Sequence, residues 1–223
     1  MRHLIAITPT VEAQQNTIKE SSNMHAQTPL EPPDIHYLRA TEGWLGLGDW
    51  VSARDELEQI TPAARAHPAV LMVRCDVFHA ARNWNACLAA AETLLKTAPE
   101  KINSWLECSV ALQRVGRVQD AYALLLPAVE RFPESWDITY NLACFSSQLG
   151  HLVEAWWWLE KSIQRHDAKA VIRAALGDYD LELLWPQIAR IAADLQTDVG
   201  SSTHRTGKVC KRSANLALQQ RCS

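Results

Sequence analysis

The sequence is short of glycine and has no long apolar run. Only eight of its 223 residues are glycine, runs of β-branched residues are few, and alanine, leucine and glutamate are common, which favours helices over strands. No stretch approaches the roughly 18 apolar residues that a membrane-spanning helix needs, and the apolar segment at 4–7 is too short for a signal peptide. Because 48% of the residues are hydrophobic, the chain can still form a core. We therefore expect a soluble, cytoplasmic, helical protein without a membrane partner.

Motifs of the common catalytic, cofactor and metal sites are also missing. There is no G-x-S-x-G, no P-loop, no G-x-G-x-x-G and no H-x-x-x-H. None of the six cysteines belongs to a C-x-x-C pair or has zinc-finger spacing to a histidine; Cys75 and Cys87 instead occupy positions that suit a small apolar side chain. Cys210 and Cys222 are expected to be free thiols, as in a reducing compartment. The sequence thus predicts no enzyme, no cofactor and no metal.

Charge is distributed unevenly along the chain. Residues 34–195 contain 15 Lys or Arg against 21 Asp or Glu, a net charge of −6, whereas residues 196–223 contain 5 against 1, a net charge of +4. An acidic body argues against a nucleic-acid partner, because binding to phosphates needs clustered cations. For the basic tail two interpretations stay open: contact with an acidic partner, or a solvated segment.

A regular repeat organises the central part of the chain. The residues that open the second helix of each unit are evenly spaced: Trp50, Trp84, Val118 and Leu152. Three residues later each unit has a small residue: Ala53, Cys87, Ala121 and Ala155. The first helices carry their own small residue at the same spacing: Thr41, Cys75, Ser109 and Ala143. Two helices can cross closely only where both lack bulk, so these rows predict four helical hairpins of similar geometry.

The third unit follows one family pattern nearly position for position. The matching residues are Trp105, Ser109, Leu112, Gly116, Ala121, Leu125, Ala128 and Pro133. On these residues the chain resembles the tetratricopeptide-repeat (TPR) family, whose repeat of about 34 residues equals the spacing of the rows above. The resemblance covers about 160 residues and implies an all-α fold, a right-handed α-α superhelix (TPR solenoid). The chain departs from the pattern at Arg82, where a turn glycine is usual, and at Arg65 and Asp167, where proline is usual.

The resemblance and the composition together divide the chain into three parts. We expect a disordered polar segment at 1–33, a TPR domain at 34–195 and a disordered basic tail at 196–223. A last repeat cannot bury its outer face alone, so a capping helix pair is expected to follow it. The predicted repeats and cap are 34–67, 68–101, 102–135, 136–169 and 170–195.

The capping segment has a distinctive sequence. We expect helices at 168–176 and 181–195, with Pro186 kinking or splitting the second. Residues 175–185 contain D-x-D-L-E-x-L-W and resemble the closing segment of a group of short bacterial TPR proteins that have no assigned biochemical role. Segments 40–45 and 140–144 are similar to that group as well. This likeness bears on the fold and leaves the function open.

The first helices of a TPR superhelix line its concave groove, so the resemblance also implies a partner-binding surface. The predicted groove residues are Leu38, Glu42, Leu45, Met72, Asp76, His79, Leu106, Val110, Gln113, Tyr140, Asn141 and Cys144. They combine an apolar row with a mildly acidic one, which suits a peptide with apolar side chains and a basic residue. Leu38 and Glu42 stand where co-chaperones with a carboxylate clamp have Lys and Asn, so that clamp is absent. Asn141 matches the family's peptide-binding asparagine, or is a solvated helix residue.

Three consecutive tryptophans, Trp156–Trp158, suggest a second surface. Trp156 is expected to pack against the cap, and Trp157 and Trp158 to face outward, where an aromatic patch marks a contact surface. In the alternative, the cap with Trp185 covers most of this patch. The leading hypothesis is a non-enzymatic scaffold or adaptor that binds a protein or peptide in the groove. The second hypothesis is a self-assembling subunit that dimerises through the Trp156–Trp158 face.

Overall fold

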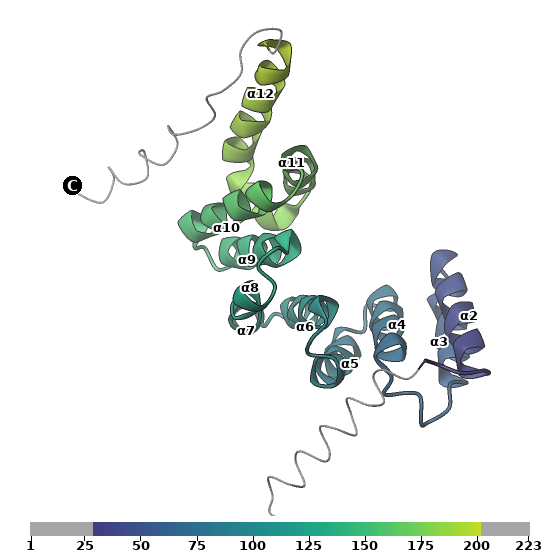
Figure 1. The fold of residues 1–223 in the computed structure, drawn as a ribbon. Coiled ribbons are helices and arrows are strands. Elements are labelled where there is room, and N and C mark those ends of the chain that lie inside the picture. Colours follow the sequence, from purple (N-terminus) through teal and green to yellow (C-terminus); the bar gives the residue numbers. More distant parts are fainter. Residues whose placement is uncertain (1–28, 202–223) are drawn as a thin grey trace, which may run out of the picture.

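The computed structural model describes residues 29–201, with side chains to Asp194, and every regular element in this range is helical. The helices form an arc of stacked hairpins (Figure 1). In chain order they are α2 (Asp34–Gly46), α3 (Trp50–Glu58), α4 (Pro68–Ala80), α5 (Trp84–Thr97), α6 (Ile102–Arg114), α7 (Val118–Leu125), α8 (Ala128–Arg131), α9 (Trp136–Gln148), α10 (Leu152–Arg165), α11 (Ala168–Leu176), the 3-10 helix η1 (Tyr179–Leu184) and α12 (Trp185–Ser201). Within this range no helix has the length and apolarity needed to cross a membrane.

The described part of the chain extends beyond the predicted domain at 34–195 on both sides. Residues 1–28 and 202–223 lie outside the described residues, so the disorder predicted there stays a prediction. At the N-terminal side, Leu30 packs against the core of the first hairpin. At the C-terminal side, α12 continues to Ser201 and does not end at Leu195. The core contact of Leu30 and the end of α12 thus lie a few residues outside the predicted domain.

Each first helix packs against its second helix at the two rows of small residues. The helix pairs are α2 with α3, α4 with α5, α6 with α7, and α9 with α10. All eight small residues are fully buried at these crossings. The Sγ atoms of Cys75 and Cys87 lie 3.9 and 3.8 Å from the backbone oxygen of the opposite residue, which shows how closely α4 and α5 approach. Cys75 and Cys87 are free and buried, which confirms that they serve the packing, and Cys108 and Cys144 are free and buried as well.

One backbone conformation recurs in the turn of every hairpin. Gly48, Gly116 and Gly150 have φ values of 79°, 83° and 80°, in the left-handed region where glycine has no steric penalty. Arg82 occupies the equivalent place in the second hairpin, with φ of 54°. The repeat therefore imposes its turn geometry even where the sequence lacks glycine.

Two connections depart from a regular repeat, each for a local reason. Pro127 cannot donate a backbone hydrogen bond, and the second helix of the third hairpin is split there into α7 and α8. Between α3 and α4 the chain makes turns at 62–66, and Arg65 takes the place of the usual proline. The Arg65 guanidinium donates to the backbone oxygens of Glu58 (3.0 Å) and Ile60 (3.1 Å), and so caps the end of α3.

The apolar core is divided along the arc. A large cluster of buried residues runs from the α4–α5 crossing to α12. A smaller cluster joins α2, α3 and one side of α4, with Leu57 and Ile60 at its centre. The first hairpin therefore shares its core with α4, a third small cluster (Leu71, Leu94 and Ala98) lies in the second hairpin, and the large cluster extends through the later hairpins and the cap.

The cap differs in detail from the expected helix pair. Its second helix is split, because η1 ends at Leu184 and α12 begins at Trp185 with Pro186 in its first turn, where proline is tolerated. The Trp185 indole donates to the backbone oxygen of Ala175 (2.9 Å), which fixes the corner between α11 and α12. Trp158 is only 5% exposed and belongs to the large core, so the prediction that it faces outward is wrong. It lies three residues after Ala155 and shares that residue's inward side of α10.

Candidate partner-binding face

The first helices α2, α4, α6 and α9 carry the predicted groove residues, and we call their common surface the first-helix face. Along α2, α4 and α6, Glu42 and Asp76 are exposed. The predicted apolar groove residues of the same three helices are half-buried: Leu45, Met72, Leu106 and Val110. Leu38 is the exception, because it is 4% exposed and packs in the core of the first hairpin. It is therefore a core residue, and the predicted contact with a partner at Leu38 is wrong.

An acidic row runs across the three helices of this region. Although part of its side chain is exposed, partial desolvation by the surrounding residues raises the pKa of Asp76, and the neighbouring Glu42 raises it further. Burial likewise raises the pKa of Glu107, with a further contribution from Asp76. Among the residues that the structure describes, none of these three carboxylates forms an ion pair. We call this region, with the half-buried apolar residues around it, the open half of the first-helix face.

Glu107 was not among the predicted groove residues, although the sequence contained a signal for it. It lies one full repeat before Asn141, the position matched to the family's peptide-binding asparagine. Asn141 itself donates its side-chain amide to the backbone oxygen of Asp137 in the same helix (2.9 Å). The repeat register could have assigned Glu107 to the face by its equivalence to Asn141.

His79 borders the open half at the turn end of α4. Its ring makes an edge contact with Trp84 (centroids 5.1 Å apart), and the Arg114 guanidinium lies 5.7 Å from the centre of the same indole. Burial lowers the pKa of His79, and the nearby Arg114 lowers it further, so the ring is neutral at pH 7. The open half therefore carries negative charge on its acidic row and no compensating charge from His79.

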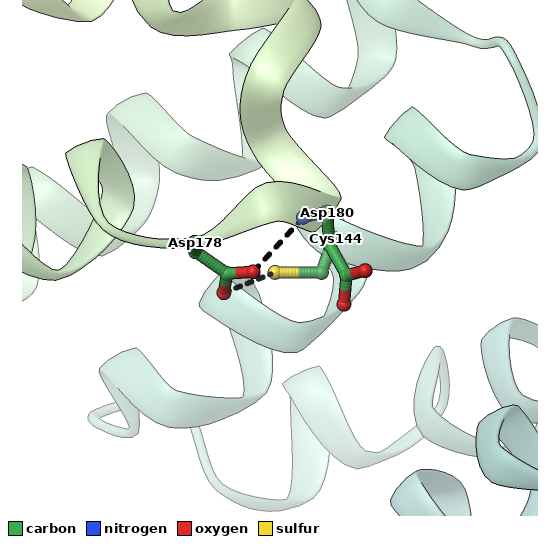
Figure 2. A group of neighbouring side chains, drawn as sticks. All are labelled: Cys144, Asp178 and Asp180. Atoms are coloured by element: carbon green, nitrogen blue, oxygen red, sulfur yellow. Dashed lines mark hydrogen bonds between the residues drawn. The ribbon is translucent and has the colours of Figure 1, made fainter.

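The rest of the first-helix face is covered by the chain itself. Asp178 Oδ2 accepts hydrogen bonds from the Tyr140 hydroxyl (3.1 Å) and the Cys144 thiol (3.6 Å). Asp180 Oδ2 accepts one from the Gln113 side-chain amide (2.7 Å). Figure 2 shows the carboxylate of Asp178 beside the sulfur of Cys144. We call this region the closed half, and residues 178–184 the closing segment.

The hydrogen-bond donors that hold the closing segment in the closed half are electrically neutral. Burial raises the pKa of Tyr140 far above its ordinary value, and the adjacent Cys144 and Asp178 raise it further. The pKa of Cys144 is raised well above 9.0 for the same reasons, burial first and then Asp178 and Asp180. Both groups keep their protons at pH 7 and can donate them to the carboxylates. The predicted groove residues Gln113, Tyr140 and Cys144 are thus occupied by the closing segment, which the sequence did not predict.

Cys144, Asp178 and Asp180 also meet the distance criterion for a metal site, since one ligand atom from each lies within 4.8 Å of the others. Their chemistry favours hydrogen bonding. Asp178 Oδ1 accepts from the backbone N–H of Asp180 (3.0 Å), and its Oδ2 is shared by Tyr140 and Cys144. A cysteine ligand must be a thiolate, and the raised pKa of Cys144 opposes that form. We interpret the group as the anchor of the closing segment.

Comparisons with known proteins agree with this architecture. No family model and no curated protein matches the chain. Among solved structures, the crystal structure of MamA protein has a TM-score of 0.60 at 14% identity over 79% of this chain and 98% of that one. MamA from Desulfovibrio magneticus RS-1 has a TM-score of 0.59 at 13% identity, over 79% and 100% of the two chains. The fold is an α-solenoid of the TPR type.

The second predicted surface of this TPR-type solenoid is reduced to one tryptophan. Trp157 is 48% exposed, and the Lys161 ammonium lies 4.3 Å from the centre of its ring. Val153, one turn earlier on the same side of α10, is 84% exposed. Trp156 is half-buried and packs against the core, and Trp158 is buried. The exposed patch therefore consists of Val153 and Trp157.

Proposed function

We propose that the protein is a non-enzymatic scaffold that binds a segment of a protein partner on the open half of the first-helix face. The observation that carries this proposal is the acidic row of Glu42, Asp76 and Glu107, which lies among half-buried apolar side chains and forms no ion pair with any residue that the structure describes. A surface of this kind attracts a ligand that supplies both cations and apolar groups. The TPR-type fold supports a general protein-interaction role.

The partner segment is expected to alternate basic and apolar side chains. Lys or Arg would neutralise the acidic row, and leucine-like side chains would pack on Met72, Leu106 and Val110. The closed half supports this by contrast, because its neutral donors hold two carboxylates. A segment rich in Asp or Glu would be repelled by the open half. A nucleic acid, which is also anionic, is disfavoured for the same reason.

A synthetic peptide of alternating Lys and Leu, labelled with a fluorophore, tests the proposal in the full chain by fluorescence polarisation. We expect binding that weakens about 10- to 100-fold in the triple variant Glu42→Gln, Asp76→Asn, Glu107→Gln, since each of three charge pairs contributes about 0.5–1 kcal/mol. The matched control triple variant, Glu92→Gln, Glu100→Gln, Glu130→Gln, removes the same charge from exposed positions outside this face. Equal weakening in both variants, or tighter binding of a Glu and Leu peptide, would contradict the proposal.

We also propose a cytoplasmic location, supported by the free cysteines among the described residues. The accessibility of the expected thiols Cys210 and Cys222 tests this directly. In protein isolated under conditions that trap thiols, both should react with a maleimide, and recovery of either one in a disulfide would count against a reducing compartment.

A second candidate function is self-assembly through Val153 and Trp157. The exposed apolar pair on α10 favours it, although the burial of Trp158 leaves a smaller patch than expected. Sedimentation over a concentration series should show association that Trp157→Ser abolishes. A strict monomer at the highest concentration would reject this candidate.

A further inference from the structure

Only one part of the first-helix face is covered by the closing segment. The closing segment contacts α9 and accepts a hydrogen bond from Gln113 near the end of α6. The face goes on along α6 to Leu106 and Glu107, and Asp76 of α4 lies close enough to Glu107 to raise its pKa. Farther on, α4 packs against α2. A segment from the C-terminal part of the chain thus already occupies one end of the surface whose other end is open. This arrangement suggests that another segment of the same chain could occupy the open half.

The open half carries charge that the described residues do not compensate. Asp76 lies close enough to Glu107 to raise the pKa of Glu107, and Glu42 lies close enough to Asp76 to raise the pKa of Asp76. A half-buried carboxylate such as Glu107 gains more from a cation than a fully solvated one, because water screens it less. The occupant should therefore be rich in Lys or Arg and poor in Asp or Glu.

Two segments of the chain lie outside the described residues, and they differ sharply in charge. Residues 1–28 contain two Lys or Arg and two Asp or Glu, which gives no net charge. Residues 202–223 contain five Lys or Arg and no Asp or Glu, together with apolar residues such as Leu216 and Leu218. Only the second segment has the composition that the open half requires. Its 22 residues, if extended, reach up to about 75 Å from Ser201.

We propose that residues 202–223 bind in cis to the open half of the first-helix face and compete there with a partner segment. This inference rests on the proposed function in taking that face as the binding surface. A tethered segment has an effective concentration in the millimolar range, so even a weak intrinsic affinity suffices for occupancy. A partner then binds with an apparent affinity reduced by the fraction of molecules whose face is free.

Paramagnetic relaxation enhancement in the full chain tests the proposal without any external partner. All described cysteines are buried, so a nitroxide can be attached to Cys210 in a Cys222→Ser background. The expected result is an intensity loss of about twofold or more for the amide signals of Glu42, Asp76 and Glu107. The loss should disappear in the triple variant Glu42→Gln, Asp76→Asn, Glu107→Gln and at about 0.5 M salt, where charges are screened. It should persist in the control triple variant at Glu92, Glu100 and Glu130.

A mixture of two samples distinguishes binding of the chain's own residues 202–223 from binding of the same residues of a second copy. Isotope-labelled chain without the nitroxide is mixed with unlabelled chain that carries it. Intensity loss in the mixture would show binding in trans and overturn the proposal. The proposal would also be overturned if the chain that carries both the isotope label and the nitroxide showed no intensity loss. Persistence of the loss in the triple variant Glu42→Gln, Asp76→Asn, Glu107→Gln would overturn it as well.

The Lys and Leu peptide distinguishes failure of this inference from failure of the proposed function. A tail variant, Arg205→Gln, Lys208→Gln, Lys211→Gln, Arg212→Gln, should bind the peptide at least about threefold more tightly than the original chain, because its face is free more often. Equal affinity for both chains would overturn competition by the tail while leaving the proposed function intact. No binding to either chain would contradict the proposed function, whereas the relaxation measurement would still report the position of the tail.

Discussion

The two halves of the first-helix face use equivalent positions of the repeat for opposite chemistry. In the closed half, Tyr140 and Cys144 are protonated donors that hold the carboxylate of Asp178. In the open half, the position equivalent to Cys144 is Glu42 in the first hairpin and Asp76 in the second, and both are anionic acceptors. One backbone geometry therefore presents donors at one end and acceptors at the other. The side chains at these positions, and not the fold, therefore decide whether the face presents donors or acidic acceptors.

The largest expected effect comes from breaking the closed half at Asp178. This carboxylate caps η1 and accepts the hydrogen bonds of Tyr140 and Cys144. Asp178→Ala would remove the cap and leave the half-buried hydroxyl and the buried thiol without this acceptor. We expect the free energy of unfolding to fall by about 2–3 kcal/mol. Urea denaturation measures this change. The control is Asp55→Ala at an exposed position, which should change the free energy of unfolding by no more than about 0.5 kcal/mol. A loss in Asp178→Ala no larger than in the control would mean that Asp178 does not anchor the closing segment.

A smaller effect is expected from Tyr140→Phe, which removes one donor and keeps the aromatic packing. The free energy of unfolding should fall by about 1 kcal/mol at pH 7. The pKa of Tyr140 is higher in the folded protein than its ordinary value of 10.0, so its contribution to stability is complete below that value and is lost as the pH rises above it. The variant should therefore lose less stability than the original chain above pH 10. Urea titrations at neutral and alkaline pH measure both quantities, and parallel pH profiles would show that the hydroxyl does not titrate as inferred.

The arrangement of the hairpins could be predicted from the sequence because it depends on local, repeated features. The small residues at the crossings recur once in every repeat and the turn glycines in three of the four, and each acts within its own hairpin. The position of the closing segment could not be predicted in this way. It depends on hydrogen bonds between residues far apart in the chain, such as that from Gln113 to Asp180, and no periodic pattern encodes them. The error at Trp158 was avoidable, because its spacing of three residues from Ala155 places it on the buried side of the helix.

The turns at Arg82 and Gly150 allow the same left-handed backbone conformation to be compared in the second and the fourth hairpin. This conformation costs a residue with a side chain, here Arg82, about 1 kcal/mol, whereas Gly150 in the fourth hairpin adopts the same conformation freely. Arg82→Gly removes this strain and adds some entropy to the unfolded chain. The net expectation is a gain of about 0.5 kcal/mol in the free energy of unfolding. Gly150→Ala is the matched change in the fourth hairpin, and urea denaturation should show a lower free energy of unfolding for this variant. A lower free energy of unfolding in both variants would mean that the Arg82 side chain makes a stabilising contact.

The smallest expected effect concerns the uncompensated charge of the open half. The pKa of Glu107 is raised by burial and by Asp76, so its carboxylate destabilises the fold at pH 7, and this penalty disappears as the pH falls through the raised pKa and below its ordinary value of 4.5. Glu107→Gln should raise the free energy of unfolding at pH 7 by about 0.3 kcal/mol, because solvent screens most of the repulsion. The gain should vanish below pH 4.5, where the original glutamate is protonated, and the exposed Glu92→Gln should show neither effect. A gain of the same size at both pH values would mean that the amide acts by packing and that the acidic row carries no repulsion for a cationic ligand to relieve.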